Sequence, residues 1–211
     1  MLKFVYLREL QTYMNFLAHI YLSGDNELIK IGNFMADGIR GQQYTNFPIE
    51  VQKGVLLHRA IDTFTDANTT YRKSKHRLHE KYGHYSGVIM DIIYDHFLAK
   101  NWNNYSNEDL EDYSNKFYDS LKQNYDILTD KTKNMMPYMI ARNWLKSYAT
   151  IAGLEMILFQ MDHRTKNRAN MQEAIVELQK FYTFFEEEFT SFFTELQEHC
   201  KIKLVEINKI F

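Results

Sequence analysis

Two aspartates lie inside one of the most apolar segments of the chain. In the run VIMDIIYDHFL, residues 88–98, Asp91 and Asp95 are four residues apart, so a helix places them on one face. Apolar residues surround the whole circumference of such a helix, which predicts that it is buried. A buried carboxylate is unfavourable unless a cation or strong hydrogen bonds compensate it, and two like charges on one face are worse. We therefore expect a positive group between them.

Further polar pairs share this four-residue spacing on segments that otherwise have the pattern of apolar helices. They are His58–Asp62–Asp66, Asn15–His19 and Asn33–Asp37. Helical proteins build divalent-metal sites from imidazole and carboxylate groups on facing helices. His96 directly follows Asp95 and points roughly 100° away on an ideal helix, so we expect it to reach the site from the side or to support a ligand. The spacings predict a metal site.

Each of these residues also has a purely structural interpretation. A lone histidine on an apolar face is more often a satisfied core residue than a ligand, and Asp66 could simply cap a helix. Arg59, Arg72 or Arg142 could neutralise Asp91 or Asp95 in a structural salt bridge. The convergence of histidine and aspartate on several apolar helices favours the metal site.

The elements that must position these residues are predicted to be helices. Only two of the 211 residues are Pro and eight are Gly, and apolar residues recur at helical spacing almost throughout. No repeat or linker divides the chain, and we expect Pro48 and Ser106 at helix starts. The prediction is an all-α, single-domain helical bundle. Helices are expected near 14–23, 27–40, 48–67, 70–81, 87–102, 107–127, 135–148, 151–164 and 167–199.

Composition excludes several classes of protein. A hydrophobic fraction of 45% and an aromatic fraction of 15% exclude a disordered chain. No stretch approaches the roughly 20 apolar residues of a membrane span, and charges interrupt the N-terminus where a signal peptide would be apolar. The single cysteine, Cys200, allows no internal disulfide. With a net charge of −2, no nucleic-acid partner is indicated, and we expect a soluble cytoplasmic protein.

Four blocks of the sequence resemble the bacterial acyl-carrier-protein phosphodiesterases in order and approximate spacing: MNFLAH (14–19), GNFMADGIRG (32–41), GVLLHRAIDTFTD (54–66) and MDIIYDHFLAKNW (90–102). The likeness continues more weakly to about residue 200. Proteins of this family begin at the Met of the first block. The resemblance therefore implies an N-terminal extension at residues 1–13 and one phosphodiesterase domain at residues 14–211, with a fold related to the HD-domain phosphohydrolases.

The resemblance also implies an activity, which is manganese-dependent hydrolysis of the phosphodiester between 4′-phosphopantetheine and the carrier's serine, giving apo-carrier protein. A divalent cation suits this chemistry because it polarises phosphoryl oxygens and makes water a better nucleophile, while a nearby His or Asp moves protons. Arg59 or Arg40 could clamp the phosphate. By position, the implied metal-site residues are His58, Asp62 and Asp95, followed by Asp37, His19 and Asp91. The implied catalytic residues are His58, Asp62, Asp95, His96 and Arg59.

A basic run at residues 71–84 suggests how a partner would bind. It holds five Lys or Arg and three His against one Glu. Such a run is often only a solvated face. Because acyl carrier proteins are small, strongly acidic helical proteins, the resemblance favours a docking surface made of Arg72, Lys73, Lys75 and Arg77.

Two other functions stay open at this point. One is an HD-type phosphohydrolase that acts on a nucleotide or another small phosphoester without a protein partner. The other is a non-catalytic helical adaptor whose buried acids form salt bridges.

Overall fold

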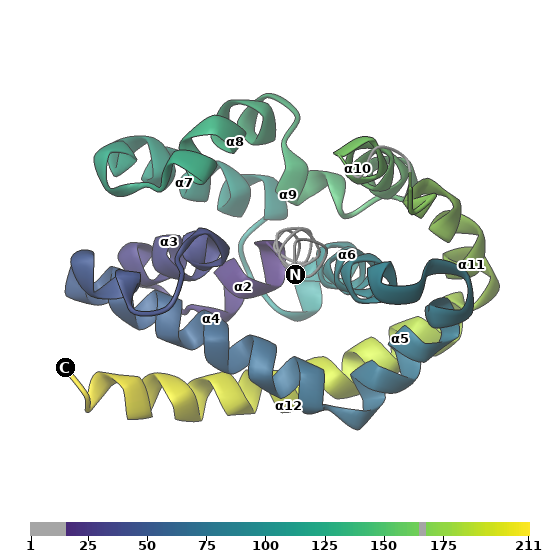
Figure 1. Cartoon of the computed structure of the whole chain (residues 1–211), viewed down its shortest axis with the longest axis horizontal. Coiled ribbons are helices and arrows are strands. Elements are labelled where there is room, and N and C mark those ends of the chain that lie inside the picture. Colours follow the sequence, from purple (N-terminus) through teal and green to yellow (C-terminus); the bar gives the residue numbers. More distant parts are fainter. Residues whose placement is uncertain (1–15, 165–167) are drawn as a thin grey trace, which may run out of the picture.

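The computed structural model describes residues 16–164 and 168–211, and within these ranges every regular element is a helix (Figure 1). The all-α prediction is thus confirmed. The α-helices are α2 (Phe16–Leu22), α3 (Glu27–Met35), α4 (Ile49–Ala67), α5 (Thr69–Tyr82), α6 (Ser86–Lys100), α7 (Leu110–Gln123), α8 (Asp130–Ala141), α9 (Trp144–Ser147), α10 (Ile151–Arg164), α11 (Ala174–Lys180) and α12 (Tyr182–Asn208). Short 3₁₀ turns join them: η1 (Ala36–Gly38), η2 (Gln43–Asn46), η3 (Gly83–Tyr85), η4 (Trp102–Asn104), η5 (Tyr125–Ile127) and η6 (Met171–Glu173).

Helix α6 lies at the centre of the bundle and packs against α2, α5, α10 and α12. Almost every one of its side chains is buried, as the apolar circumference predicted. The long helix α12 runs along one side of the molecule beneath α4 and α5 (Figure 1). Among the helices described, none is long and apolar enough to cross a membrane.

Several predicted helix boundaries are wrong. The segment 135–148 is not one helix, because α8 begins at Asp130 and the left-handed backbone of Asn143 (φ 41°) separates it from α9. The segment 167–199 divides at Phe181 into α11 and α12. Ser106 does not cap α7; that position belongs to Asp109, whose carboxylate accepts a hydrogen bond from the Glu111 amide. The extension at residues 1–13 lies outside the described residues, as does Asn15, so the domain division stays a prediction.

The crossing of α3 and α4 depends on two glycines. A Cβ atom on Gly54 would lie 2.2 Å from the carbonyl oxygen of Ile29, and one on Gly32 would lie 2.2 Å from that of Val51. Any larger residue would therefore push the two backbones apart. Because Asn33 follows Gly32 and His58 lies one turn beyond Gly54, the close approach brings these two polar side chains together at the same end of the crossing.

Candidate metal centre

Three side chains from two helices form a compact cluster of potential metal ligands. His19 on α2, and His58 and Asp62 on α4, each offer one ligand atom, and these atoms all lie within 4.8 Å of one another. The Asp62 carboxylate lies 3.5 Å from His19 Nε2 and 3.2 Å from His58 Nε2. Both histidines are buried, whereas half of the Asp62 side chain is exposed. Two imidazole nitrogens and a carboxylate are a donor set that suits a divalent metal.

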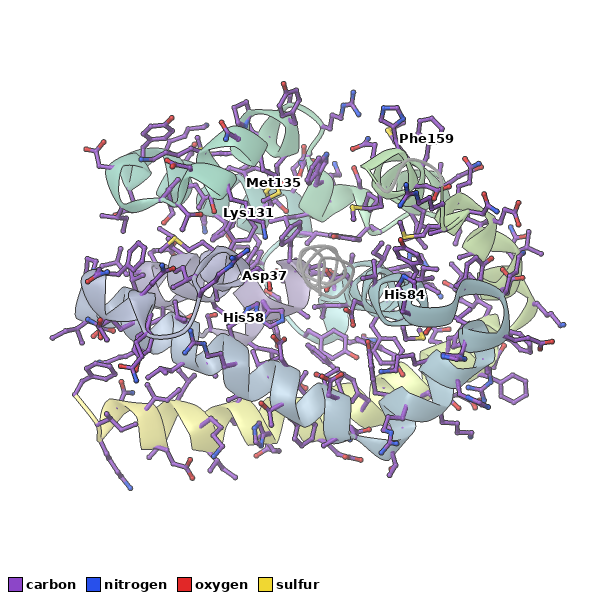
Figure 2. The ribbon with its side chains drawn as sticks, in the orientation of Figure 1. Asp37, His58, His84, Lys131, Met135 and Phe159 are labelled. Atoms are coloured by element: carbon purple, nitrogen blue, oxygen red, sulfur yellow. The ribbon has the colours of Figure 1, made fainter. Side chains whose placement is uncertain are left out.

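A second carboxylate lies beside this cluster. Asp37, on η1 directly after α3, places Oδ1 3.3 Å from His58 Nε2. Figure 2 shows the two side chains next to each other near the middle of the molecule. Asp37 thus offers a possible cation a further carboxylate oxygen.

Asn33 lies behind the two histidines and orients both rings. Its amide nitrogen donates to the carbonyl oxygen of His19 and to Ser23 Oγ, so its Oδ1 is an acceptor. This oxygen lies 2.6 Å from His19 Nδ1 and 3.2 Å from His58 Nδ1. Both Nδ1 atoms must therefore donate their hydrogens to Asn33, and both Nε2 atoms face the carboxylates. This is the support that metal-ligating histidines usually have.

The electrostatics of the cluster favour positive charge. Burial alone would lower the pKa of His58, but hydrogen bonds with Asp37 and Asp62 outweigh this effect and raise the pKa to about 10. Burial raises the pKa of Asp62, and the hydrogen bonds from His19 and His58 reverse this, so that its pKa lies below its usual range. The Asp62 carboxylate therefore stays ionised.

The cluster opens into a cavity of about 550 Å³ between α4, α5 and α6. Its far side is lined by Tyr71, Lys75 and His79 of α5, by His84 of η3, and by Asp91 of α6. Figure 2 shows His84 to the right of His58, beside α6. A substrate that reaches the cluster through this cavity would pass both acidic and basic side chains.

Of the two aspartates of α6, Asp91 is the one that lines this cavity, and it is only partly buried. Its Oδ1 accepts a hydrogen bond of 2.5 Å from the Tyr71 hydroxyl. Burial raises the pKa of Asp91 well above its usual range, and the charges of Asp62, Asp95 and Asp66 add to this, while the Tyr71 hydrogen bond offsets only part of it. Asp91 is thus poised to carry a proton.

Asp95 lies apart from the metal cluster. It is fully buried, and its two oxygens accept hydrogen bonds from the backbone amides of Leu17 (3.1 Å) and Ala18 (2.9 Å) in the first turn of α2. Burial raises its pKa to about 7, against the lowering effect of these two amides. We expected a cation between Asp91 and Asp95. Instead, each aspartate has its own hydrogen-bond donors, which are the Tyr71 hydroxyl for Asp91 and two backbone amides of α2 for Asp95.

Two more residues that we expected in the site have other partners. His96 Nδ1 lies 2.8 Å from the carbonyl oxygen of Tyr148, and His96 Nε2 lies 2.9 Å from the Tyr182 hydroxyl. His96 therefore joins α6 to the region around α9 and to α12. Arg59 donates to the carbonyl oxygen of Gly41 at 2.6 Å and lies over the Tyr44 ring. It fixes the segment between η1 and α4, and neither side chain lines the cavity.

The basic run divides into cations that pair with α12, a lysine that lines the cavity and an exposed arginine. Arg77 is mostly buried and forms a two-pronged salt bridge with Glu188 of α12, at 2.5 and 2.8 Å. Lys73 also pairs with Glu188, at 3.0 Å. Lys75 lines the cavity, and Arg72 is exposed. Arg77 therefore holds α5 to α12 rather than offering a free charge.

Two kinds of site residue were missed from the sequence. Tyr71 lies in the basic run, which gives no sign of its contact with Asp91. An aromatic residue with a hydroxyl at the start of an otherwise charged helix is nevertheless a candidate for the buried face. Gly32 and Gly54 lie inside predicted helices, where a glycine often marks a close backbone approach. That signal was available and points to the α3–α4 crossing.

The same four blocks that suggested a family are matched by known sequences. Residues 14–196 match the family model for acyl carrier protein phosphodiesterase. A protein of that name from Yersinia pestis is 24% identical over 91% of this chain and 100% of its own length. Another, from Photorhabdus laumondii, is 26% identical over 90% of this chain and 96% of its own length.

No solved structure matches the chain significantly, so the expected relation to HD-domain phosphohydrolases stays a prediction. The family model, in contrast, covers most of the sequence and all four blocks, including His19, Asp37, His58 and Asp62. The chain therefore belongs to the acyl carrier protein phosphodiesterase family.

Proposed function

We propose that this protein hydrolyses the phosphodiester that joins 4′-phosphopantetheine to the serine of acyl carrier protein, releasing apo-carrier protein. The observation that carries the proposal is the cluster of His19, His58 and Asp62 in the lining of a cavity of about 550 Å³. The relatives from Yersinia pestis and Photorhabdus laumondii, which span nearly the same length, have names that state this activity.

The residues of the cluster fit a divalent cation, which we propose to be Mn²⁺. His19 and His58 would hold it through Nε2, because Asn33 engages both Nδ1 atoms, and Asp62 and Asp37 would supply oxygens. A mixed set of imidazole and carboxylate donors suits manganese among other first-row metals. When bound, such a cation neutralises charge on the phosphoryl oxygens and makes water more acidic.

The protein's own groups would handle substrate position and protons. In this hydrolysis, water adds to phosphorus, the bond from phosphorus to the serine oxygen breaks, and that oxygen takes up a proton. We propose that Asp91 gives this proton, since it faces the cavity, is held by Tyr71, and has a raised pKa. The chain would act in the cytoplasm, which agrees with a single, buried cysteine.

The test is to incubate holo-carrier protein with the purified protein and Mn²⁺, and to follow loss of the arm by intact mass. We expect conversion to apo-carrier protein, and none with the Asp62→Asn variant. Cation binding, measured by calorimetry on both proteins, supplies a readout that does not need turnover. Unchanged holo-carrier protein despite tight cation binding would contradict the substrate, and would favour a small phosphoester instead. A wild-type protein that binds no divalent cation would contradict the metal site.

A further inference from the structure

Helix α5 carries positive side chains on two sides, and the two sides have different surroundings. On the side that faces α11 and α12, Lys73 and Arg77 pair with Glu188, and Lys81 pairs with Glu173 and Glu177, each at 3.1 Å. Arg77 is mostly buried, whereas Lys73 and Lys81 are exposed, but all three already have a glutamate partner within the chain. An acidic partner could bind them only by breaking an existing ion pair.

The opposite side of α5 consists of Arg72, Lys75, His76 and His79, which the helical period places on one face. We refer to these four residues as the cavity-side face. Lys75 and His79 line the cavity of the metal cluster, and Arg72, His76 and His79 are exposed. Within residues 16–164 and 168–211, this face has one ion pair, between Lys75 and Asp66 at 4.0 Å, at the limit for such a pair.

The cavity-side face also lies close to the site of chemistry. Lys75 approaches Asp66, which is four residues after Asp62 on α4 and thus about 6 Å further along the helix axis. His84 extends the basic lining of the cavity beyond the end of α5. Lys75, whose ion pair with Asp66 is long, therefore lines the cavity about one helical turn from a proposed ligand.

We propose that the cavity-side face of α5 is the docking surface for an acidic protein segment, namely the surface of the carrier protein around its modified serine. This inference rests on the proposed function and identifies which charges recognise the partner. A prosthetic arm that reaches the cluster must bring the protein that bears it against the rim of the cavity. Acidic side chains there would meet Arg72, which has no ion pair among the described residues, and Lys75, whose ion pair with Asp66 is long, rather than the cations already paired with glutamates.

The physical consequence is mainly electrostatic. Attraction between an acidic partner and an exposed basic face raises the association rate, and salt weakens it over a Debye length of about 8 Å at physiological ionic strength. The face should therefore contribute strongly to affinity at low salt. Its contribution should decline as salt is added, whereas the internal pairs of Lys73 and Lys81 should have little effect on the partner.

The chain offers a matched pair of variants for the test. Arg72→Gln/Lys75→Gln removes two positive charges from the cavity-side face, and Lys73→Gln/Lys81→Gln removes two from the paired side. The ligand is apo-carrier protein, which lacks the arm, so that binding is measured without turnover. Thermal unfolding should first show that both variants are folded.

We expect the first variant to raise the Kd for apo-carrier protein about tenfold at low salt and to flatten its salt dependence, and the second to change Kd less than about twofold. Equal effects of the two variants would overturn the proposal. So would an unchanged Kd in the first variant, no binding by the wild type at low salt, or tighter binding of an RNA oligonucleotide than of the carrier. Cleavage with unaltered binding would contradict the docking face alone, whereas binding without cleavage would contradict the proposed function alone.

Discussion

The imidazole rings of His19 and His58 lie stacked on each other, with centroids 4.3 Å apart and planes inclined by 29°, although they come from different helices. Two like-oriented rings of this kind need a common partner that sets their direction. Asn33 Oδ1 is that partner, because it is within hydrogen-bond distance of both Nδ1 atoms. The candidate metal centre thus depends on a neutral residue that lies on the Nδ1 side of both rings, away from the proposed ligand atoms.

Replacement of Asn33 should therefore weaken the binding of a divalent cation. Asn33→Leu keeps the size of the side chain and removes the acceptor of both imidazoles, so we expect a loss of about 10–100-fold in the affinity for Mn²⁺. Titration calorimetry on the folded variant measures this. Asn33→Asp is the control, since it keeps an acceptor oxygen and should retain more affinity than Asn33→Leu. Equal affinity in the wild type and in Asn33→Leu would show that the rings need no such support.

Asp95 should affect the pH dependence of stability. Its pKa in the folded protein is about 7, above the value of about 3.9 of an unfolded chain. Between pH 4 and 7 the unfolded state loses this proton while the folded state keeps it, so rising pH lowers the free energy of unfolding, and the loss is complete above pH 7. Relative to Asp95→Asn, the wild type should lose about 2–3 kcal/mol between pH 5 and 7.

Urea unfolding at several pH values checks this difference, and the comparison with Asp95→Asn separates Asp95 from the other titrating groups. Parallel curves for the two proteins would contradict the raised pKa. Calorimetry with Mn²⁺ is a second readout: if Asp95→Asn removes cation binding as Asp62→Asn does, the sequence-based prediction of Asp95 as a ligand would stand after all.

The contrast between Asp62 and Asp95 shows which contacts the spacing of residues along the sequence can predict and which it cannot. Four-residue spacing places His58 and Asp62 on one face of α4, and these two side chains are neighbours because the pair depends only on the local helix. His19 and Asp37 reach them from α2 and η1, and spacing alone does not determine such contacts between elements. A buried aspartate, however, can be satisfied by a cation or by the free amides at the start of another helix. For Asp95 the choice depends on where α2 begins in space, and spacing within α6 contains no such information.

The same limit applies to the fold. Helical periodicity predicted the existence of most helices, whereas the break at Asn143 has neither Gly nor Pro to signal it. The basic run is another case. Arg77 belongs to the interior because Glu188, 111 residues further along, lies against it, and no local pattern could show this.

Gly54→Ala should damage the metal centre from a distance. The new Cβ atom would meet the Ile29 carbonyl oxygen at 2.2 Å, and only movement of α3 away from α4 relieves that contact. Because Asn33 and Asp37 move with α3 while His58 stays on α4, we expect both lower thermal stability and weaker cation binding. Gly41→Ala is a suitable comparison, since nothing lies within 4 Å of its added Cβ, although its positive φ adds backbone strain.

The outcome for Gly54→Ala separates two explanations. Loss of stability in both variants with normal cation affinity would mean that the glycine only permits folding. Loss of affinity confined to Gly54→Ala, measured at a temperature where both proteins are folded, would show that the helix crossing sets the geometry of the cluster.

Asp91 should be needed only for substrates whose leaving group takes up a proton. The serine oxygen of the carrier protein is such a leaving group, whereas nitrophenolate departs from bis(p-nitrophenyl) phosphate without one. Asp91→Asn should therefore lower kcat on holo-carrier protein by about 10²–10⁴-fold and leave turnover of the nitrophenyl diester nearly unchanged. Because the acid must carry its proton, wild-type activity on the carrier should fall as pH rises through the raised pKa of Asp91, and this decline should disappear in the variant.

Asp62→Asn, which alters the proposed metal centre, should lose both activities. If Asp91→Asn loses activity equally on the two substrates, Asp91 supports the site without donating a proton. The affinity of that variant for Mn²⁺ then tests the sequence-based prediction of Asp91 as a ligand, because an unchanged affinity would contradict it.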